Sequence, residues 1–283
     1  STYDLNFINA AKEACEKLGV EYKIITNVPE GQECYDKAAE LADDGCNIIF
    51  ADSFGHEDYM IQAAKDFPDV QFCHSTGTKA HTEGLSNYHN AFASIYEGRY
   101  LAGIAAGMKL NEMIANGEFT ADEAKIGYVG AFTYAEVISG YTSFFLGARS
   151  VCPTATMEVT FTGSWYDETA EKEGAQKLIK NGCKLISQHA DSMGAPTACE
   201  TAGVPHRNII AMQGPFSYAL NCALMKQFSI RYLVTKDSGA VGGFAEKAQA
   251  AQDTGAQLIV VRRPAENGQT AAQILARCKE VLV

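Results

Sequence analysis

Long hydrophobic runs, paired-cysteine motifs and metal-ligand spacings are all missing from this 283-residue sequence. No apolar run reaches the roughly 18 residues of a membrane-spanning helix, so no membrane span is expected. The 6 histidines show neither a His-x-x-x-His nor a Glu-x-x-His pattern, which removes the usual zinc-site signature. No Gly-x-Ser-x-Gly turn is present either, so a serine hydrolase is not expected.

Positive charge is also scarce, with 23 Lys and Arg against 34 Asp and Glu, and the formal net charge is −11. An acidic surface repels the phosphates of nucleic acids and of anionic membranes. We therefore expect a small neutral or cationic molecule as the partner, and no nucleic acid. No signal peptide is expected, and the sequence opens at Ser1 without Met, which fits a processed or trimmed chain.

The 9 cysteines are scattered, odd in number and without Cys-x-x-Cys spacing. This usage favours buried free thiols over a metal site or a disulfide framework. It indicates a reducing environment or a source that avoids oxygen. An exported protein of an anaerobe would fit equally well.

Helical and strand patterns alternate along nearly the whole chain. The alternation predicts parallel sheets covered on both faces, a three-layer αβα fold. The expected helices are 4–18, 31–44, 59–67, 91–114, 137–150, 168–181, 195–202, 218–228, 243–254 and 270–281. The expected strands are 21–26, 47–51, 70–74, 85–88, 125–129, 157–161, 184–188, 208–212, 231–235 and 257–262.

A polar stretch at 116–123 is the best linker candidate. It divides the chain into a first α/β lobe at 1–124 and a second at 125–283. The first lobe begins at a helix, although a doubly wound domain usually begins with a central strand. Either that strand has been trimmed, or another segment takes its place.

Several motifs in the amino-terminal part occur in an order that points to one family. They are IFADSFGHEDYMIQAAKDFPDVQF at 49–72, NYHNAFASIYEGRYLAGIAAG at 87–107, KIGYVGAF at 125–132, SWYDETAEKEGAQKLI at 164–179 and ISQHADSMGAP at 186–196. Through them, residues 1–204 resemble the basic membrane protein family, the purine-nucleoside receptor lipoproteins of ABC importers. The resemblance implies a periplasmic-binding-protein type I fold of flavodoxin-like (Rossmann-like) lobes hinged around a purine base or nucleoside. It also implies a lipid-anchored, extracytoplasmic protein that works with an ABC permease.

Aromatic residues near strand ends are the first binding candidates. Ser53 and Phe54 follow the strand at 47–51, where open parallel sheets bind ligands. A purine stacked on Phe54 or Trp165 would bury apolar area and gain about 0.5–1.5 kcal/mol of ring–ring preference. Phe54 could instead cap the core.

Polar candidates lie at two further places. Asp191 and Ser192 follow the strand at 184–188 and could accept the ligand's N–H groups, although Asp191 could also cap the next helix. Tyr3 and Asp4 stand where the family carries an aromatic and a polar residue near the ligand, and Asp4 is also a good helix cap.

This first resemblance ends near Pro205. The family continues there with a strand, a polar loop and a Trp/Tyr-rich segment that completes the cleft, and its first strand precedes the Tyr3 region. Neither part is found here, so weakened ligand binding is expected.

The carboxy-terminal part resembles a different family. Its motifs are NIIAMQGPFSYALNCALMKQF at 208–228, YLVTKDSGAVGGFAEKAQAA at 232–251 and IVVRRP at 259–264. Residues 206–283 thereby resemble the carboxy-terminal half of precorrin-6A reductase, an NADPH-dependent, cytoplasmic enzyme of cobalamin biosynthesis. In that family these loops help to line the substrate and cofactor cleft.

The loops of this part also suggest anion binding. Gly214 and Ser217 open a helix whose free N–H groups could hold a carboxylate or phosphate, and Lys236 and Ser238 form a second polar turn. Ser217 could equally be a helix cap. Because no Gly-x-Gly-x-x-Gly follows any strand, no cofactor and no catalysis are expected, with NADP and reductase activity as the alternative.

We interpret the whole as an engineered chimera of the two families. The strands after residue 206 are expected to extend the sheet that begins at 125–129. Three functions stay open: binding of a purine base or nucleoside without catalysis, a scaffold without a biological role, and the reductase activity.

Overall fold

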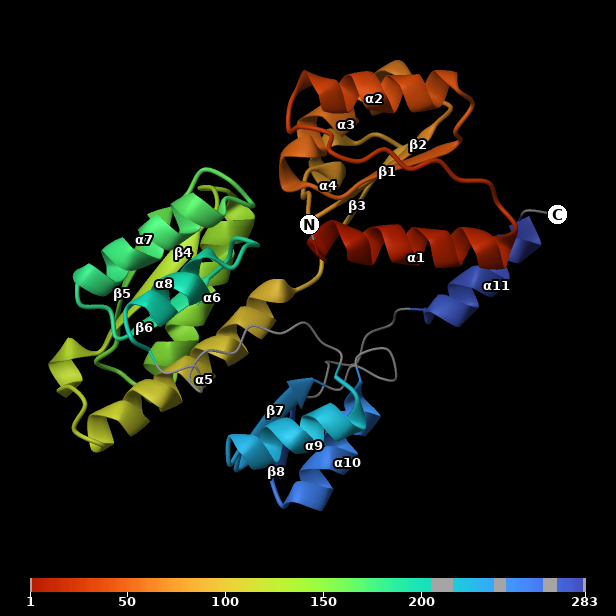
Figure 1. The fold of residues 1–283 in the computed structure, drawn as a ribbon. Helices are drawn as coiled ribbons and strands as arrows, with labels where there is room; N and C mark the ends of the chain where they lie inside the picture. Colours follow the sequence, from red (N-terminus) through yellow and green to blue (C-terminus); the bar gives the residue numbers. More distant parts are fainter. Residues whose placement is uncertain (1, 205–215, 237–242, 262–268, 282–283) are drawn as a thin grey trace. The chain divides into compact units, whose positions relative to one another are not determined.

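The computed structural model describes residues 2–204, 216–236, 243–261 and 269–281. The chain divides into two compact units, Ser1–Ala198 (unit 1) and Cys199–Val283 (unit 2). Unit 1 holds two α/β lobes, each with a three-stranded parallel sheet, and unit 2 holds a two-stranded parallel sheet (Figure 1). The expected fold class, α/β with parallel sheets, is confirmed.

The first lobe of unit 1 has the sheet order β1-β2-β3. Helices α2 and α3 cover one face, where Ile49, Met60 and Phe72 join one buried core. Helix α1 lies on the opposite side of this sheet (Figure 1), where Phe7 contacts Phe50 with ring centroids 5.7 Å apart. The elements are α1 (Thr2–Leu18), α2 (Gln32–Asp43), β1 (Ile48–Ala51), η1 (Phe54–His56), α3 (Glu57–Asp66), β2 (Gln71–Ser75), α4 (Ala80–Glu83) and β3 (Tyr88–Ala91).

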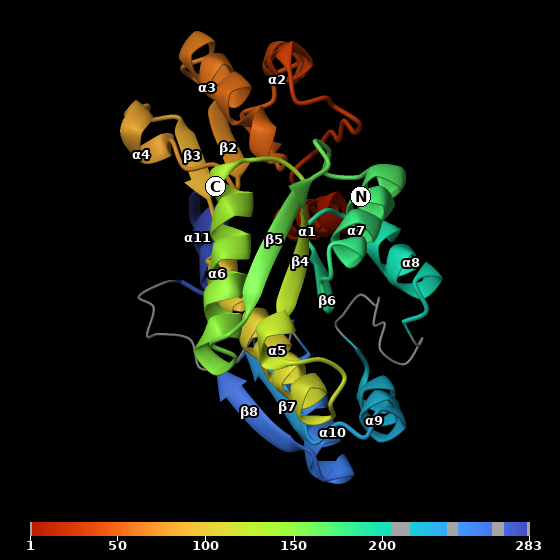
Figure 2. The same cartoon turned by 90° about the vertical axis from the view of Figure 1, so that its left-hand side faces the viewer.

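The second lobe has the order β5-β4-β6, so β4 is central. Figure 2 shows this sheet between α6 on one side and α7 with α8 on the other. Ile126 and Tyr128 of β4 pack into the core with α5 and α6, whereas Val129 packs with Leu178 of α7. The elements are α5 (Ile95–Ala115), η2 (Ala121–Glu123), β4 (Lys125–Gly130), α6 (Ala135–Val151), β5 (Thr156–Phe161), α7 (Glu168–Lys180), β6 (Leu185–Gln188) and α8 (Gly194–Thr201).

Glycines allow α5 and α6 to approach each other closely. A Cβ atom at Gly103 would lie 1.9 Å from the carbonyl oxygen of Phe144, and one at Gly147 would lie 2.0 Å from that of Tyr100. Neither distance is possible for real atoms, so these two positions require glycine. Helix α5 thus belongs to the core of the second lobe.

Unit 2 is built on the parallel pair β7–β8. Met225 of α9 and Ala250 and Ala251 of α10 form its buried core. The elements are α9 (Tyr218–Gln227), β7 (Tyr232–Lys236), α10 (Phe244–Thr254), β8 (Gln257–Val261) and α11 (Ala271–Val281).

The expected extension of the second lobe's sheet is wrong for the strands that the structure describes. Strands β7 and β8 pair with each other, whereas β4 pairs with β5 and β6. Helices α9 and α10 cover one face of the unit 2 sheet, since Leu233 and Leu258 pack against the core that these helices form. The predicted strand at 208–212 lies outside the described residues.

The predicted strand at 21–26 is also wrong, since residues 19–29 contain neither helix nor strand. Its pattern is nevertheless strand-like, and Tyr22 and Ile24 are 45% and 40% exposed. A strand needs a neighbour to bond to, and β1 pairs with β2 alone among the described strands. The segment therefore has strand-like side chains but is bonded to no strand among those that the structure describes.

Within the described ranges, no helix combines the length and apolar character needed to cross a bilayer. All 9 cysteines are free thiols, of which Cys34, Cys152 and Cys183 are buried and the others partly buried. Burial raises the pKa of Cys34 to about 12, so this thiol stays protonated and unreactive at neutral pH.

Candidate functional site

Aromatic rings from both lobes of unit 1 gather beyond the carboxyl ends of the strands. Phe54 follows β1, Phe132 and Tyr134 follow β4, and Trp165 follows β5. Phe54 stacks on Tyr134 with centroids 4.9 Å apart, and Tyr134 stacks on Phe132 at 4.8 Å. Trp165 and Phe132 form a T-shaped pair with centroids 5.4 Å apart. Such a group of flat faces suits a ligand that contains a ring.

Glu30 connects this aromatic group to the first lobe. Its Oε1 accepts hydrogen bonds from Ser53 Oγ at 2.5 Å, from Gly55 N at 2.9 Å and from Trp165 Nε1 at 2.9 Å. A Cβ atom at Gly55 would lie 2.4 Å from Glu30 Cδ, so the glycine lets the carboxylate come this close. One carboxylate oxygen thus fixes Ser53 and the indole ring of Trp165 together.

Acidic groups lie near the same strand ends. The pKa of Asp52 is raised by burial and then by the charge of Asp4, and the pKa of Asp191 is raised by the same two causes in the same order. Tyr3 Oη donates to the carbonyl oxygen of Asp52 at 3.2 Å. Carboxylates of this kind can accept N–H or O–H groups of a ligand, which would offset their repulsion by Asp4.

A largely buried contact between His189 and Glu136 lies beside the aromatic group. His189 Nε2 lies 3.0 Å from Glu136 Oε2, and the two side chains are 6% and 11% exposed. His189 Nδ1 lies 3.1 Å from Tyr128 Oη, and burial raises the pKa of Tyr128 to about 12. Tyr128, whose hydroxyl stays protonated at neutral pH, and Glu136 thus hold the two ring nitrogens of His189. Its ring centroid is 6.2 Å from that of Trp165.

Ser192 is engaged by the protein itself. Its hydroxyl and its backbone N donate to Glu171 Oε2 at 2.5 and 3.1 Å, and Glu171 is fully buried. The Ser192 hydroxyl also accepts from Gly194 N at 3.1 Å, at the start of α8. Ser192 thus bonds to an amide at the start of α8, which is the capping role given above as an alternative for Asp191. Asp191 donates its own backbone N to the carbonyl oxygen of Trp165 at 2.8 Å.

The structure thus brings most of the candidate residues into one region, although their roles in binding stay predictions. Asp4 interacts electrostatically with both Asp52 and Asp191, and Tyr3 interacts with Asp52. Ser53 and Trp165 both bond to Glu30, and Phe54 stacks on Tyr134. Sequence reasoning missed Glu30, because it follows a proline in a segment without strand or helix. It also missed the residues Asp52, Phe132, Tyr134, Glu136 and His189, although all lie within or beside quoted motifs.

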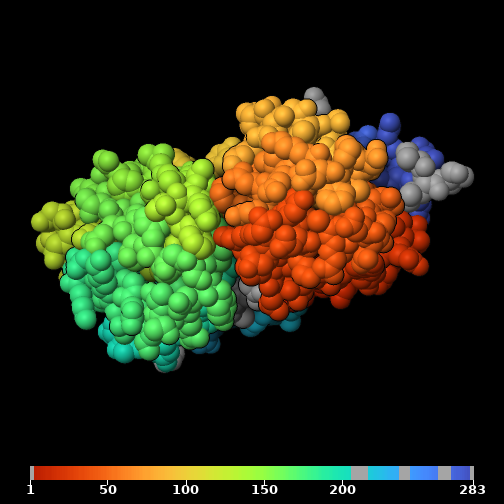
Figure 3. Space-filling model, turned by 90° about the horizontal axis from the view of Figure 1, so that it is seen from above, coloured from red at the N-terminus to blue at the C-terminus, as the bar shows by residue number. Residues whose placement is uncertain are grey.

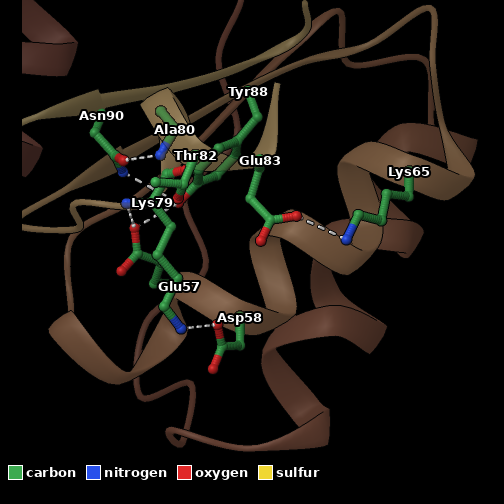
Figure 4. Close-up of polar contacts among 9 residues, drawn as sticks. All are labelled: Glu57, Asp58, Lys65, Lys79, Ala80, Thr82, Glu83, Tyr88 and Asn90. Carbon is green, nitrogen blue, oxygen red and sulfur yellow. Dashed lines mark hydrogen bonds and ion pairs between the residues drawn. The ribbon is translucent and has the colours of Figure 1, made fainter. Parts of the chain in front are cut away.

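A second polar group, at the amino end of α4, is structural (Figure 4). Glu57 Oε1 accepts from the backbone N of Lys79 at 2.8 Å and from Tyr88 Oη at 3.4 Å. Asn90 Oδ1 accepts from the backbone N of Ala80 at 2.8 Å. These bonds satisfy amides that the short helix leaves free, with Glu57 only 4% exposed. No group of His, Cys, Asp and Glu in the described ranges could hold a metal ion.

The anion-binding candidates of unit 2 are only partly described. Ser217 caps α9, since its hydroxyl accepts from Leu220 N at 3.3 Å. Gly214 and Ser238 lie outside the described residues, as does the side chain of Lys236 at the end of β7. The Ser217 hydroxyl is bonded to its own helix, and the expectation of no cofactor, with NADP as the alternative, stays a prediction.

Two α/β lobes with aromatic and acidic residues at their strand ends define a two-lobed solute-binding protein. The chain belongs to the ABC transporter substrate-binding protein PnrA-like family, whose profile matches residues 1–211. Residues 172–279 match the profile of the precorrin-6x reductase CbiJ/CobK family. The chain therefore joins segments of two families, as the motifs predict.

Individual relatives support both parts. A purine-binding protein of Brucella abortus is 37% identical over 197 residues, 69% of this chain and 52% of that protein. A putative ABC transporter glucose-binding protein of Haloferax volcanii is 34% identical over 207 residues, 73% of this chain and 48% of that protein. The chain thus spans about half the length of these relatives. A cobalt-precorrin-6A reductase of Priestia megaterium is 37% identical over 90 residues, 31% of this chain and 35% of that protein.

Solved structures agree on the fold. A galactofuranose-binding protein superposes with a TM-score of 0.55 at 18% identity, over 99% of this chain and 95% of that one. At that identity the likeness supports the two-lobed binding-protein fold and does not bear on the ligand.

Proposed function

We propose that unit 1 binds a purine base or nucleoside and does not catalyse a reaction. The observation that carries this is the stack of Phe54, Tyr134 and Phe132 beside Trp165, next to the carboxylates of Asp52 and Asp191. A purine has a flat aromatic face for the rings and N–H groups for the carboxylates. The ligand named for the Brucella abortus relative supports this choice.

Binding requires the rings to separate or to expose an outer face. Centroids 4.9 Å apart leave no space for a third ring between Phe54 and Tyr134. A purine would therefore replace one of these ring contacts, and the free energy of that contact, about 0.5–1.5 kcal/mol, is subtracted from the affinity. Weakened affinity compared with intact receptors is part of this proposal.

Isothermal titration calorimetry with adenine, adenosine, guanosine and glucose tests the ligand class. We expect saturable binding of at least one purine and none of glucose, and Phe54→Ala should weaken purine binding about tenfold or more, the effect of losing about 1.4 kcal/mol. Tyr166→Ala, at a neighbouring side chain that is 59% exposed, is the control and should bind normally. Glucose binding without purine binding would instead favour the ligand named for the Haloferax volcanii relative.

We expect the protein to act with an ABC permease only if it binds a ligand. The second candidate function is that of a scaffold that binds no ligand. Failure of every purine and of glucose to bind in the titration would favour the scaffold.

The similarity of unit 2 to the reductases calls for an independent assay. We expect no NADPH oxidation when the protein is incubated with a precorrin-6A substrate, and measurable turnover would contradict a pure binding role.

A further inference from the structure

His74 is a buried histidine that bonds β2 to the turn after β1. It lies on β2 and is 0% exposed, in the interior of the first lobe, whose surface Figure 3 shows in red and orange. Its Nε2 lies 2.7 Å from the carbonyl oxygen of Ser53. A carbonyl oxygen only accepts, so Nε2 carries a hydrogen and donates it. The imidazole thereby fixes the direction of the Ser53 carbonyl.

The charge of His74 follows from its surroundings. Burial is the main cause that lowers the pKa of His74, and a positive charge on His56 acts in the same direction. The hydrogen bond to Ser53 and the negative charges of Glu57 and Glu30 oppose this shift without reversing it. His74 is therefore neutral at neutral pH, with its hydrogen on Nε2 and none on Nδ1.

Three polar atoms converge beside Gly77. A Cβ atom at Gly77 would lie 2.3 Å from His74 Nδ1, 2.4 Å from Glu57 Oε1 and 2.6 Å from Asn90 Nδ2. Glu57 and Asn90 are bonded to backbone amides at the start of α4 (Figure 4). His74 Nδ1, in contrast, is buried and has no hydrogen-bond partner among the residues that the structure describes. A buried acceptor without a partner costs free energy.

This cost indicates that the position needs a histidine for its other nitrogen. An apolar side chain would fill a buried position of β2 without leaving an acceptor unpaired. Residues that break the pairing rule concentrate at functional sites, where another property is required of them. For His74 that property is the hydrogen bond from Nε2 to Ser53. The bond, and not the packing of the ring, accounts for a histidine here.

Ser53 connects His74 to the aromatic group. The Ser53 carbonyl also accepts from His56 N at 3.0 Å, at the start of η1, and Ser53 Oγ donates to Glu30 Oε1 at 2.5 Å. The next residue is Phe54, whose ring belongs to the aromatic group. Because a peptide bond is planar, a fixed carbonyl fixes the plane that joins Ser53 to Phe54. The Phe54 ring is thus placed through the Ser53 carbonyl.

We propose that His74 is a positioning residue for purine binding: in its neutral form it holds the Ser53 carbonyl through Nε2 and thereby sets the place of the Phe54 ring. The consequence for the ligand rests on the proposed function of unit 1, whereas the hold on Ser53 needs no ligand. His74 acts through Ser53 and does not contact the purine, because its own side chain is fully buried.

Two substitutions separate the roles of the two ring nitrogens of His74. In His74→Gln the side-chain amide nitrogen takes the place of Nε2 and can donate to the Ser53 carbonyl, whereas in His74→Asn the shorter side chain reaches only as far as Nδ1. Both variants place a neutral amide at the same buried position, so both should lower the free energy of unfolding to a similar extent. His89→Asn, at an exposed histidine of β3, is the control.

The first measurement is hydrogen–deuterium exchange without a ligand. The amides of 55–56 are both bonded in the turn after β1, and those of 72–73 in β2 report a general loss of structure. We expect exchange at 55–56 to be about tenfold or more faster in His74→Asn than in the parent, and His74→Gln to stay within about twofold of the parent. Equal exchange at 55–56 in the two variants would overturn the proposal. So would an equal acceleration at 55–56 and 72–73 in His74→Asn, because that is the result of a purely structural role.

The second measurement is the purine titration. We expect His74→Asn to bind about tenfold or more weakly than the parent and His74→Gln to recover most of this loss, although the two variants unfold with similar free energies. Equal affinities of the two variants for a purine that the parent binds would overturn the connection to the Phe54 ring. If the parent binds no purine, the proposed function fails by itself, and exchange at 55–56 still decides whether His74 positions the turn. His89→Asn should match the parent in both measurements.

Discussion

The two lobes of unit 1 each have a three-stranded parallel sheet, but the first strand of each lobe is packed differently. In the second lobe, β4 is bonded on both edges and covered on both faces, with Ile126 and Val129 fully buried. In the first lobe, β1 pairs on one edge only among the described strands, and Ile48 is 68% exposed. The difference shows that strand-like side chains are not enough, because a strand forms only when a neighbour accepts its hydrogen bonds.

The largest effect is expected from damage to the better packed lobe. Gly103→Val should destabilise the protein by about 3 kcal/mol or more, because its Cβ would lie 1.9 Å from a carbonyl oxygen of α6. Urea unfolding followed by circular dichroism measures the loss. Gly98→Ala is the matched control on the same helix: its Cβ would meet only Ile95 Cδ1, at 3.9 Å, so this variant should be neutral or slightly stabilising. Similar losses in both variants would contradict the close approach of α5 and α6 as the cause, because helix propensity favours both substitutions.

The contrast between the lobes also shows how far sequence reasoning reaches. The apolar run of β4 predicts a buried strand, and the structure confirms it with 0% exposure for Tyr128 and Val129. The pattern at 21–26 predicts a strand equally well and fails, because the pattern records side chains and not the presence of a bonding partner. Periodicity is local information, whereas pairing depends on the whole sheet.

The candidate site divides in the same way. Phe54 and Trp165 could be proposed from the resemblance and, for Phe54, from its place after a strand, and the structure brings both to the aromatic group. Glu30 could not, since its contact with Trp165 spans 135 positions of sequence and only the fold reveals it. The candidates of the carboxy-terminal part cannot be compared in this way, because Gly214 and Ser238 lie outside the described residues.

The next largest effect concerns the connection between the lobes. Glu30→Ala should cost about 1–3 kcal/mol, because Ser53, Gly55 N and the Trp165 indole lose a shared acceptor. Trp165 is the only tryptophan, so its fluorescence reports the change directly. We expect a shift of its emission maximum together with the lower unfolding free energy. Glu33→Ala removes the same charge three positions away and should change neither quantity.

A pH series sharpens the assignment of the carboxylates. The pKa values of Asp52 and Asp191 are raised, so protonation begins at a higher pH than the ordinary value of about 3.9. A protonated carboxyl no longer accepts the ligand's N–H group with full strength, so purine affinity should fall as pH decreases through the raised pKa. Asp191→Asn should reduce this dependence, whereas Asp69→Asn, at an exposed residue, should preserve it. A flat affinity profile in the parent protein would exclude both carboxylates from binding.

The smallest effects come from the amino ends of α7 and α2, one capped by a side chain and the other not. Asp167 caps α7 by accepting from Ala170 N at 2.9 Å, so Asp167→Ala should cost about 1 kcal/mol. The equivalent position of α2 is Gly31, which has no side-chain cap and an extended backbone that any residue can adopt. Gly31→Ser should therefore add a few tenths of a kcal/mol, because a serine hydroxyl can accept from a free amide of the first turn. Thermal unfolding of the two variants should shift in opposite directions, and a loss of stability in Gly31→Ser would contradict the capping prediction.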